Sequence, residues 1–285
     1  MTAYGNDYIY VTDLENNLIN RCEVSRILSE RNFSIGSDGL IVIEKSDKAD
    51  FFMRVYNPDG TEAEMCGNGL RSVGKLVYDK GLTNKSDITV ETKGGIKKVS
   101  LVTVCGKVVN IRADIGKPVF ECEKIPVIWN GERMCGENIK ICDRMFTAYA
   151  MSLGNPHLVL FCKDTENIDI VKYGKAAENL PFFPMRTNVE FCRINSRKSI
   201  RLRTWERGTG ETGACATGCC ACLCAAVLAD MCDREVTVLQ NGGETVVEWD
   251  DMGHLHMTAP SKTVFEGKIM LDTKFFRNAD NGGVS

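Results

Sequence analysis

The chain has 285 residues, long enough for one large domain or for two of about 140 residues each. Its 44% hydrophobic and 26% charged residues are ordinary for a globular protein, and its net charge of −3 gives no basic surface for nucleic acid. The sequence has no apolar run near 20 residues and no basic segment leading into an apolar one at its start, which argues against a membrane span and a secretory signal.

Fourteen cysteines occur, mostly singly and within apolar patterns such as "VTVCGKV". Disulfide frameworks are typical of small secreted domains, so we expect reduced thiols here, used as small hydrophobic side chains. Together these features predict a cytoplasmic protein with no nucleic-acid or membrane partner.

The first half of the chain predicts a mixed α+β unit. A strand is expected at residues 8–12, a helix at 14–29, and strands at 39–44 and 51–56. The stretch "GTEAEMCGNG" then forms a glycine-rich turn at Cys66, which leads into a helix with Leu70, Val73 and Val77 on one face. A strand at 88–95 that ends in Gly-Gly completes this part.

The second half repeats this order. It has strands at 157–162, 188–194, 199–205 and 236–243, a helix near 168–178, and a helix that runs from Cys215 to about residue 230. Cys215 follows Cys66 by 149 positions, and Arg54, Glu62 and Gly69 have counterparts at the same offset. We predict an α/β chain of the α+β type with two pseudo-symmetric halves, 1–117 and 118–263, and a last strand within 264–275 that returns to either half.

The two cysteine turns predict the chemistry. The first N–H groups of a helix lack internal partners and carry the positive end of the helix dipole, which favours a thiolate and can hold a carboxylate. If the halves are related by a pseudo-two-fold axis, Cys66 and Cys215 meet in the cleft between them. One thiolate then removes the proton α to a carboxylate, and the other thiol returns a proton to the opposite face. This interpretation is a two-base racemase or epimerase that needs no cofactor.

Other polar residues beside the turns have two interpretations each. The asparagines lie at the ends of strands, where they are either turn residues or part of the pocket lining; they are Asn6, Asn57, Asn155 and Asn188. His157 is either a loop residue or a group that tunes the acid–base pair. Glu206 and Arg207 precede the Cys215 turn and form either a surface pair or substrate contacts.

The sequence resembles the diaminopimelate epimerase family over nearly its whole length. The resemblance rests on six segments in this order: "GNDYIYV", "GSDGLIVIE", "NPDGTEAEMCGNGLRS", "SLGNPHLV", "FFPMRTNVEF" and "WERGTGETGACATG". It implies two halves, each with a mixed, largely antiparallel sheet wrapped around a central helix, and an active site between them. It also implies a cytoplasmic homodimer that interconverts LL- and meso-diaminopimelate, a step toward lysine and peptidoglycan.

The resemblance further implies roles for individual residues. Cys66 and Cys215 match the catalytic pair, and the four asparagines match positions that line the substrate pocket. Arg207 matches the position that holds the distal carboxylate, and Glu206 one that contacts the substrate amino group. The residues matching the amides that cradle the reacting carboxylate are Gly67, Asn68, Ala216 and Thr217.

Three features depart from the family pattern. Only four residues precede Gly5, so the first strand is expected to be short, and the histidine usual there is absent. Ala216 replaces a glycine after the second cysteine, and its Cβ would narrow the carboxylate cradle. The cysteines of the following helix, Cys219, Cys220, Cys222 and Cys224, are unusual and are expected to pack the core.

Two alternatives stay open. One is a racemase of the same fold that acts on another amino acid, such as histidine or lanthionine; a guanidinium at Arg207 and the asparagines favour a second α-amino-acid end. The other is a metal-binding or redox protein that uses Cys215, Cys219 and Cys222, which share one helix face. A structural zinc site usually needs four ligands, and no second Cys/His cluster is evident, so no metal site is predicted.

Overall fold

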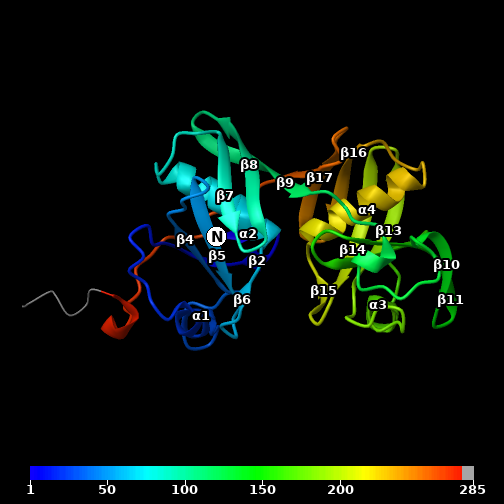
Figure 1. Ribbon diagram of the computed structural model, residues 1–285, viewed down its shortest axis with the longest axis horizontal. Coiled ribbons are helices and arrows are strands. Elements are labelled where there is room, and N and C mark those ends of the chain that lie inside the picture. Colours follow the sequence, from blue (N-terminus) through cyan, green and yellow to red (C-terminus); the bar gives the residue numbers. More distant parts are fainter. Residues whose placement is uncertain (278–285) are drawn as a thin grey trace, which may run out of the picture. The chain divides into compact units, whose positions relative to one another are not determined.

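The computed structural model describes residues 1–277 of the chain (Figure 1). It divides into two compact units: Met1–Ala113 together with the described residues after Ala259, and Asp114–Ala259. We expected boundaries at 117/118 and 263/264. The observed boundaries are at 113/114, within the strand Lys107–Gly116, and at 259/260, directly after the strand Leu255–Ala259. Both units are mixed α+β, with a sheet that dominates and two α-helices each, which confirms the predicted fold class.

The first unit is a mixed sheet with a helix against each face. Its sheet order is β9-β8-β7-β5-β4-β3, with β6 added to β5. The pairs β3/β4 and β5/β7 are parallel, whereas β4/β5, β7/β8 and β8/β9 are antiparallel. The elements are β3 (Ile9–Thr12), α1 (Arg21–Ser29), β4 (Leu40–Glu44), β5 (Phe51–Tyr56), β6 (Glu62–Ala63), α2 (Gly67–Asp79), β7 (Asp87–Thr92), β8 (Gly95–Val104) and β9 (Lys107–Gly116).

A small hairpin opens this unit. Strands β1 (Thr2–Ala3) and β2 (Asn6–Asp7) pair antiparallel around Tyr4 and Gly5, both with positive φ. A two-residue loop with both φ angles positive matches the right-handed twist of the strands it joins. The hairpin confirms the short first strand and places Asn6 directly after the turn.

The second unit repeats the same order of elements. Its sheet runs β10-β11-β12-β13-β14-β16-β17-β18, with β15 on β14, and β12/β13 and β14/β16 are its parallel pairs. Helices α2 and α4 begin at positions that differ by the predicted 149 residues. The elements are β10 (Cys135–Ile141), β11 (Arg144–Ser152), β12 (Pro156–Phe161), α3 (Ile170–Glu178), β13 (Asn188–Ser196), β14 (Ser199–Glu206), β15 (Gly210–Thr212), α4 (Ala216–Leu228), β16 (Glu235–Gln240), β17 (Gly243–Trp249) and β18 (Leu255–Ala259).

Helix α4 lies at the centre of the second unit. It contacts every strand from β11 to β14 and from β16 to β18, and residues 218–226 are all buried. A helix buried on every side must be apolar all round, and small side chains let surrounding strands approach closely. The predicted packing role of Cys219, Cys220, Cys222 and Cys224 is thus confirmed, because all four are fully buried.

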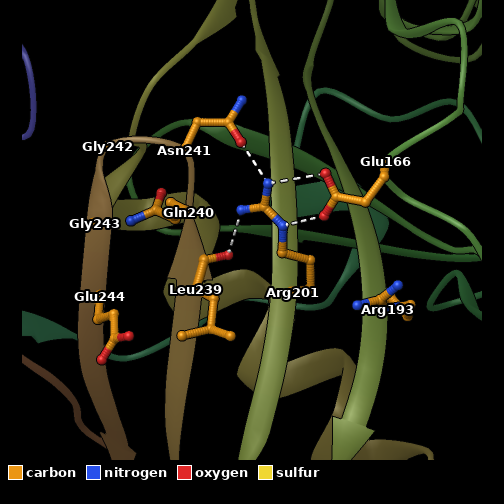
Figure 2. Close-up of a pocket in the computed structure, with 9 residues that line it drawn as sticks. All are labelled: Glu166, Arg193, Arg201, Leu239, Gln240, Asn241, Gly242, Gly243 and Glu244. Atoms are coloured by element: carbon orange, nitrogen blue, oxygen red, sulfur yellow. Dashed lines mark hydrogen bonds and ion pairs between the residues drawn. The ribbon is translucent and has the colours of Figure 1, made fainter.

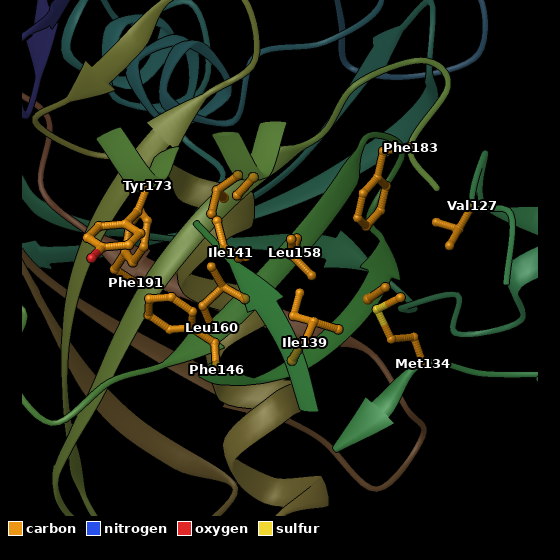
Figure 3. Close-up of a cluster of buried hydrophobic side chains, with 14 of the residues drawn as sticks. Val127, Met134, Ile139, Ile141, Phe146, Leu158, Leu160, Tyr173, Phe183 and Phe191 are labelled. Atoms are coloured by element: carbon orange, nitrogen blue, oxygen red, sulfur yellow. The ribbon is translucent and has the colours of Figure 1, made fainter. Parts of the chain in front are cut away.

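Side chains on β13 alternate between two environments, as expected for a strand covered on both faces. Val189 and Phe191 point into an apolar cluster with α3, together with Phe146 and Tyr173 (Figure 3). The residues between them, Glu190 and Cys192, belong to the opposite face, on which α4 lies. The strand therefore supports a core on one side and reaches the start of α4 on the other.

Two predicted elements differ from the structure. The helix expected at 14–29 begins only at Arg21, because the Asp13 carboxylate accepts the N–H groups of Asn17 and Leu18, and Asn20 is left-handed. The strand expected within 264–275 is not formed. This stretch is almost wholly exposed and lacks a neighbouring strand, and only a 3₁₀ turn, Thr273–Phe275, brings Phe275 into the α1 core.

Replacement of Phe191 by alanine tests the apolar cluster of Figure 3. We expect a loss of about 3–5 kcal/mol in the free energy of unfolding, because the change removes a fully buried ring and leaves a cavity. Phe33, which is 90% exposed, is the control, and Phe33→Ala should stay within about 0.5 kcal/mol. Urea denaturation of both variants measures the difference; equal losses would show that the cluster does not stabilise the unit.

Candidate functional site

The sulfur of Cys66 caps the first turn of α2. Cys66 is the N-cap residue with extended backbone angles (φ −135°, ψ 114°), and its Sγ accepts the Gly69 N–H at 3.3 Å. A Cβ on Gly69 would lie 2.5 Å from Cδ1 of Ile41 on β4, so a larger residue here would force the end of that side chain to move. The turn thus holds a thiol against the free N–H groups of a helix start, as the sequence predicted.

Asn6 and Asn68 surround this first thiol. The Cys66 thiol lies 3.7 Å from Oδ1 of Asn6, which also accepts the Asn68 side chain at 3.5 Å. The Asn6 amide is fixed by Asp38 at 2.8 Å, and Asn68 is fixed by the buried guanidinium of Arg71 at 2.6 Å. Three of the predicted site residues of the first unit therefore share one network.

Asn57 lies in a different turn of the same unit. It follows β5, and its side chain donates to Thr61 Oγ1 at 2.9 Å, while its carbonyl accepts the hydroxyl of Ser25. Neither Thr61 nor Ser25 belongs to the Cys66 network. Within this unit, Asn57 behaves as the turn residue of the two interpretations, and its contact with a substrate stays a prediction.

Cys215 caps α4 with the same geometry. Its backbone angles are φ −124° and ψ 115°, and its Sγ accepts the Gly218 N–H at 3.3 Å. The Thr217 hydroxyl lies 3.6 Å from the sulfur, and the Cys215 N–H donates to Oε1 of the buried Gln240 at 2.8 Å. Gln240 ends β16, so the strand fixes the turn from behind. Ala216 is accommodated as the first residue of α4.

The remaining predicted residues of the second unit form two groups. Asn155 donates to Thr217 at 3.5 Å and faces Nε2 of His157 at 2.9 Å, so both belong to the Cys215 network. Asn188 accepts the Arg207 N–H at 2.9 Å and donates to the Pro156 carbonyl. The Arg207 guanidinium itself is exposed and contacts the Met185 carbonyl.

Glu206 ends β14 and acts on the Cys215 thiol. Its carboxylate accepts the Thr212 hydroxyl on β15, and its negative charge raises the pKa of Cys215. The carboxylate thus acts on the thiol, whereas the Arg207 guanidinium points to solvent.

The electrostatics of the two thiols correct one expectation. Burial raises the pKa of Cys66, and this effect outweighs the Gly69 and Asn68 amides, the Tyr8 hydroxyl and the charge of Arg71, which all lower it. Burial also raises the pKa of Cys215, and Glu206 and Glu190 raise it further. The helix start alone was expected to lower both values, but loss of water around the sulfur opposes the dipole.

Four contributors were missed from sequence. Tyr8 forms a hydrogen bond with Cys66, Arg71 supports Asn68, Gln240 fixes Cys215, and Glu190 contacts His157. Tyr8 had a signal, since it precedes His157 by the repeat offset of 149 residues. Glu190 had one as well, because it is a lone carboxylate within an apolar strand.

A pocket of about 740 Å³ opens on β13, β14, β16 and β17 (Figure 2). Arg201 lies within it and is held by Glu166, Asn241 and the Leu239 carbonyl. None of the predicted site residues lines this pocket. Among its lining residues, Gln240 accepts the Cys215 N–H, but neither cysteine lines the pocket. We therefore place the chemistry at the two cysteine caps and not in this pocket.

The residues 1–277 bring no three side chains of His, Cys, Asp or Glu into an arrangement that could hold a metal ion. Cys215, Cys219 and Cys222 therefore do not form the metal site of the second alternative. Among the same residues, no helix is both long and apolar enough to cross a membrane.

The fold is shared with known enzymes. A solved structure of a phenazine biosynthesis protein of the PhzF family from Enterococcus faecalis superposes with a TM-score of 0.65, at 15% identity, over 92% of each chain. At this identity the likeness shows the fold alone. A crystal structure of a probable proline racemase from Agrobacterium radiobacter has the same fold, with a TM-score of 0.63 and 16% identity over 93% of this chain and 84% of that one.

Sequence comparison then gives the family. The family model described as diaminopimelate epimerase matches residues 1–121 and 149–264. A protein named diaminopimelate epimerase from Methanococcus maripaludis is 44% identical over 270 residues, which is 94% of this chain and 98% of that protein. Another of that name, from Acetivibrio thermocellus, is 44% identical over 273 residues, covering 95% and 98%. The chain belongs to the diaminopimelate epimerase family.

Replacement of Tyr8 by phenylalanine tests its bond to Cys66. The hydroxyl lowers the pKa of the thiol, so its removal should raise that pKa further and move alkylation of Cys66 by iodoacetamide to higher pH. Mass spectrometry of the Cys66 peptide over a pH series measures the shift. Tyr10→Phe is the control, since the Tyr10 hydroxyl bonds Ser72 instead; equal behaviour of the two variants would refute the role of Tyr8.

Proposed function

We propose that this protein is a diaminopimelate epimerase that interconverts the LL and meso forms of its substrate without a cofactor. The observation that carries the proposal is the pair of cysteine caps. Each cysteine caps the start of a helix with matching backbone angles, and each sulfur accepts a hydrogen bond at 3.3 Å from the N–H of the third helical residue. The family membership at 44% identity supports the same substrate.

The reaction follows from the two thiols. One cysteine, as thiolate, takes the proton from the α-carbon, and the electron pair left on carbon is delocalised into the adjacent carboxylate. The other cysteine, as thiol, gives its proton to the opposite face and becomes the thiolate. One proton is taken and one is given, so configuration inverts with no change of oxidation state. The reverse direction exchanges the roles of the sulfurs.

The amides at the two helix starts stabilise the charge that develops. N–H groups at a helix start are fixed donors and carry the positive end of the dipole, so they favour a carboxylate that gains negative charge. We assign this role to the amides of Gly67, Asn68, Ala216 and Thr217. Both faces of the reacting carbon then meet equivalent groups, as a reversible inversion requires.

Substrate recognition rests on the polar residues around the turns. The Arg207 side chain is exposed. One of its N–H groups donates to the Met185 carbonyl, and the rest of the guanidinium can bind a distal carboxylate. We assign substrate contacts to Asn6, Asn57, Asn155, Asn188 and Glu206 as well, following the family. His157 and Glu206 are assigned to tuning of Cys215.

We also propose that the protein is a cytoplasmic homodimer. The thiol content supports the compartment, since the fourteen cysteines, all within residues 1–277, form no disulfide there. Exposed apolar side chains such as Met270, 96% exposed, and Phe265, 64% exposed, supply surface that a second copy would cover. Analytical ultracentrifugation gives the oligomeric state.

Removal of either thiol tests the mechanism. We expect Cys66→Ala and Cys215→Ala each to lower the rate of epimerisation by at least about 10²- to 10⁴-fold, the usual contribution of a positioned acid or base. The assay follows α-proton exchange in deuterium oxide with LL- and meso-diaminopimelate, lanthionine and L-histidine. Cys22→Ala is the control, because that thiol is exposed and lies outside the caps.

The outcomes separate reaction from substrate. Exchange of diaminopimelate that is lost in both cap variants and retained in the control supports the whole proposal. Exchange of another amino acid alone would keep the two-thiol mechanism and replace the substrate. Full activity in either cap variant would contradict the two-thiol mechanism.

The pH dependence follows from the raised thiol pKa values. Catalysis needs one thiolate and one thiol, and burial raises the pKa of both groups, so the thiolate is scarce at neutral pH. We expect kcat/KM to increase as pH rises above neutrality and to fall again once the second thiol ionises. A profile from about pH 6 to about pH 10 measures this; a decline from neutrality upward would contradict it.

A further inference from the structure

Glu190 is a buried carboxylate beneath the Cys215 turn that the reaction as described does not use. It lies in the middle of β13 and is fully buried. Its Oε1 is 2.8 Å from Nδ1 of His157, and its Oε2 has no hydrogen-bond partner within residues 1–277. A Cβ on Gly218 would lie 3.0 Å from Oε1, so the carboxylate reaches directly under the start of α4.

A continuous set of contacts leads from Glu190 to the thiol. Nε2 of His157 faces Oδ1 of Asn155 at 2.9 Å, the Asn155 amide donates to Thr217 Oγ1 at 3.5 Å, and that hydroxyl is 3.6 Å from Cys215 Sγ. Because Oδ1 is an acceptor, Nε2 must carry a hydrogen. The contact between Nδ1 and Oε1 also contains one hydrogen. The pair of His157 and Glu190 thus holds two hydrogens and has no net charge.

The first unit shows that the fold does not need this carboxylate. At the repeat offset of 149, Ile41 corresponds to Glu190, and its Cδ1 lies under Gly69 as Oε1 lies under Gly218. Tyr8 corresponds to His157. An isoleucine therefore fills the place beneath one cap and a glutamate the place beneath the other. Burial of a carboxylate with an oxygen unpaired is unfavourable, so packing does not explain the choice.

We propose that Glu190 is a positioning residue for the second thiol: it fixes the ring and the hydrogens of His157 and, through Asn155 and Thr217, the environment of Cys215. The inference rests on the proposed function only for its effect on rate. The hydrogen content of His157 and the stability of the protein are properties of the free enzyme. They are measured without any substrate.

Several groups face the Cys215 thiol and Glu190 from the packed elements. Glu206 acts from β14, His157 from β12, Cys192 from β13, and Cys219 and Cys222 from α4. The two carboxylates both raise the pKa of Cys215, and hence both keep its proton in place. On the first thiol, by contrast, the Tyr8 hydroxyl and the charge of Arg71 lower the pKa. The charged groups beside the two caps thus act in opposite directions, whereas the hydrogen bonds from Thr217 and Gly218 lower the pKa of Cys215, as those from Tyr8 and Gly69 do for Cys66.

The first experiment is ¹⁵N NMR of histidine-labelled protein, which is tractable because the chain has three histidines. His254→Gln and His256→Gln assign the spectrum by elimination. We expect both ring nitrogens of His157 to carry hydrogen in the wild type and one of them to lose it in Glu190→Gln. The control is Glu44→Gln, which removes a buried carboxylate of β4 that is ion-paired with Arg54. An unchanged His157 signal in Glu190→Gln would overturn the proposal.

A second variant copies the first unit. Glu190→Ile leaves Nδ1 of the buried His157 without its partner, so the free energy of unfolding should fall. Its kcat should fall as well, about tenfold or more, as part of the 10²–10⁴ that a positioned acid or base contributes. A purely structural glutamate predicts the same loss of stability with an unchanged kcat.

The pH profile of activity completes the test. In Glu190→Gln the negative charge and one hydrogen of His157 are lost together, so the net charge beside Cys215 is unchanged and both limbs of kcat/KM should stay where they are in Glu44→Gln. A lowered kcat with unmoved limbs and the expected NMR change supports the positioning role. A displaced alkaline limb would show that Glu190 acts through its charge and would overturn it. If the wild type epimerises none of the amino acids tested, the proposed function fails, and the NMR result still decides the role of Glu190.

Discussion

The structure depends on one constraint, which is the start of a helix that packs against a sheet. Four N–H groups at such a start have no partner within the helix. In both units a cysteine sulfur accepts the N–H of the third residue, from Gly69 or from Gly218. The same contact that satisfies the backbone therefore holds a thiol at the positive end of the helix dipole. Fold and chemistry share this interaction.

The enclosed helix also explains why the surrounding sequence is so restricted. Helix α4 carries cysteine and alanine where an exposed helix would carry charged side chains, because strands contact it on all sides. The glycines of the caps have a separate reason. A Cβ on Gly69 would lie 2.5 Å from Cδ1 of Ile41, so the end of that side chain would have to move.

Periodicity and the 149-residue repeat were enough to predict the two caps, the helices that follow them and the strands around them. The strands β8, β9, β10, β11, β17 and β18 were not predicted. Periodicity and the repeat were also not enough where a single side chain decides the outcome. Asp13 binds two N–H groups and delays α1 to Arg21, and no strand is available to pair with residues 264–275. The thiol pKa values were misjudged for a related reason. The dipole is visible in the sequence, whereas the extent of burial around Cys66 and Cys215 is a property of the folded unit.

The two units share a backbone and differ in the polar groups beneath the caps. A hydroxyl from Tyr8 and the charge of Arg71 favour ionisation of Cys66, whereas Glu190 and Glu206 oppose that of Cys215. Two equal thiols would ionise in either order, and the pair would spend part of its time in the wrong state for a given substrate isomer. An inversion needs one base and one acid at the same moment. The two units have the same cysteine cap but different polar groups beside it, and this difference biases the free enzyme toward one arrangement of thiolate and thiol. The clearest example of this difference is the residue beneath the cap, which is Ile41 in the first unit and Glu190 in the second.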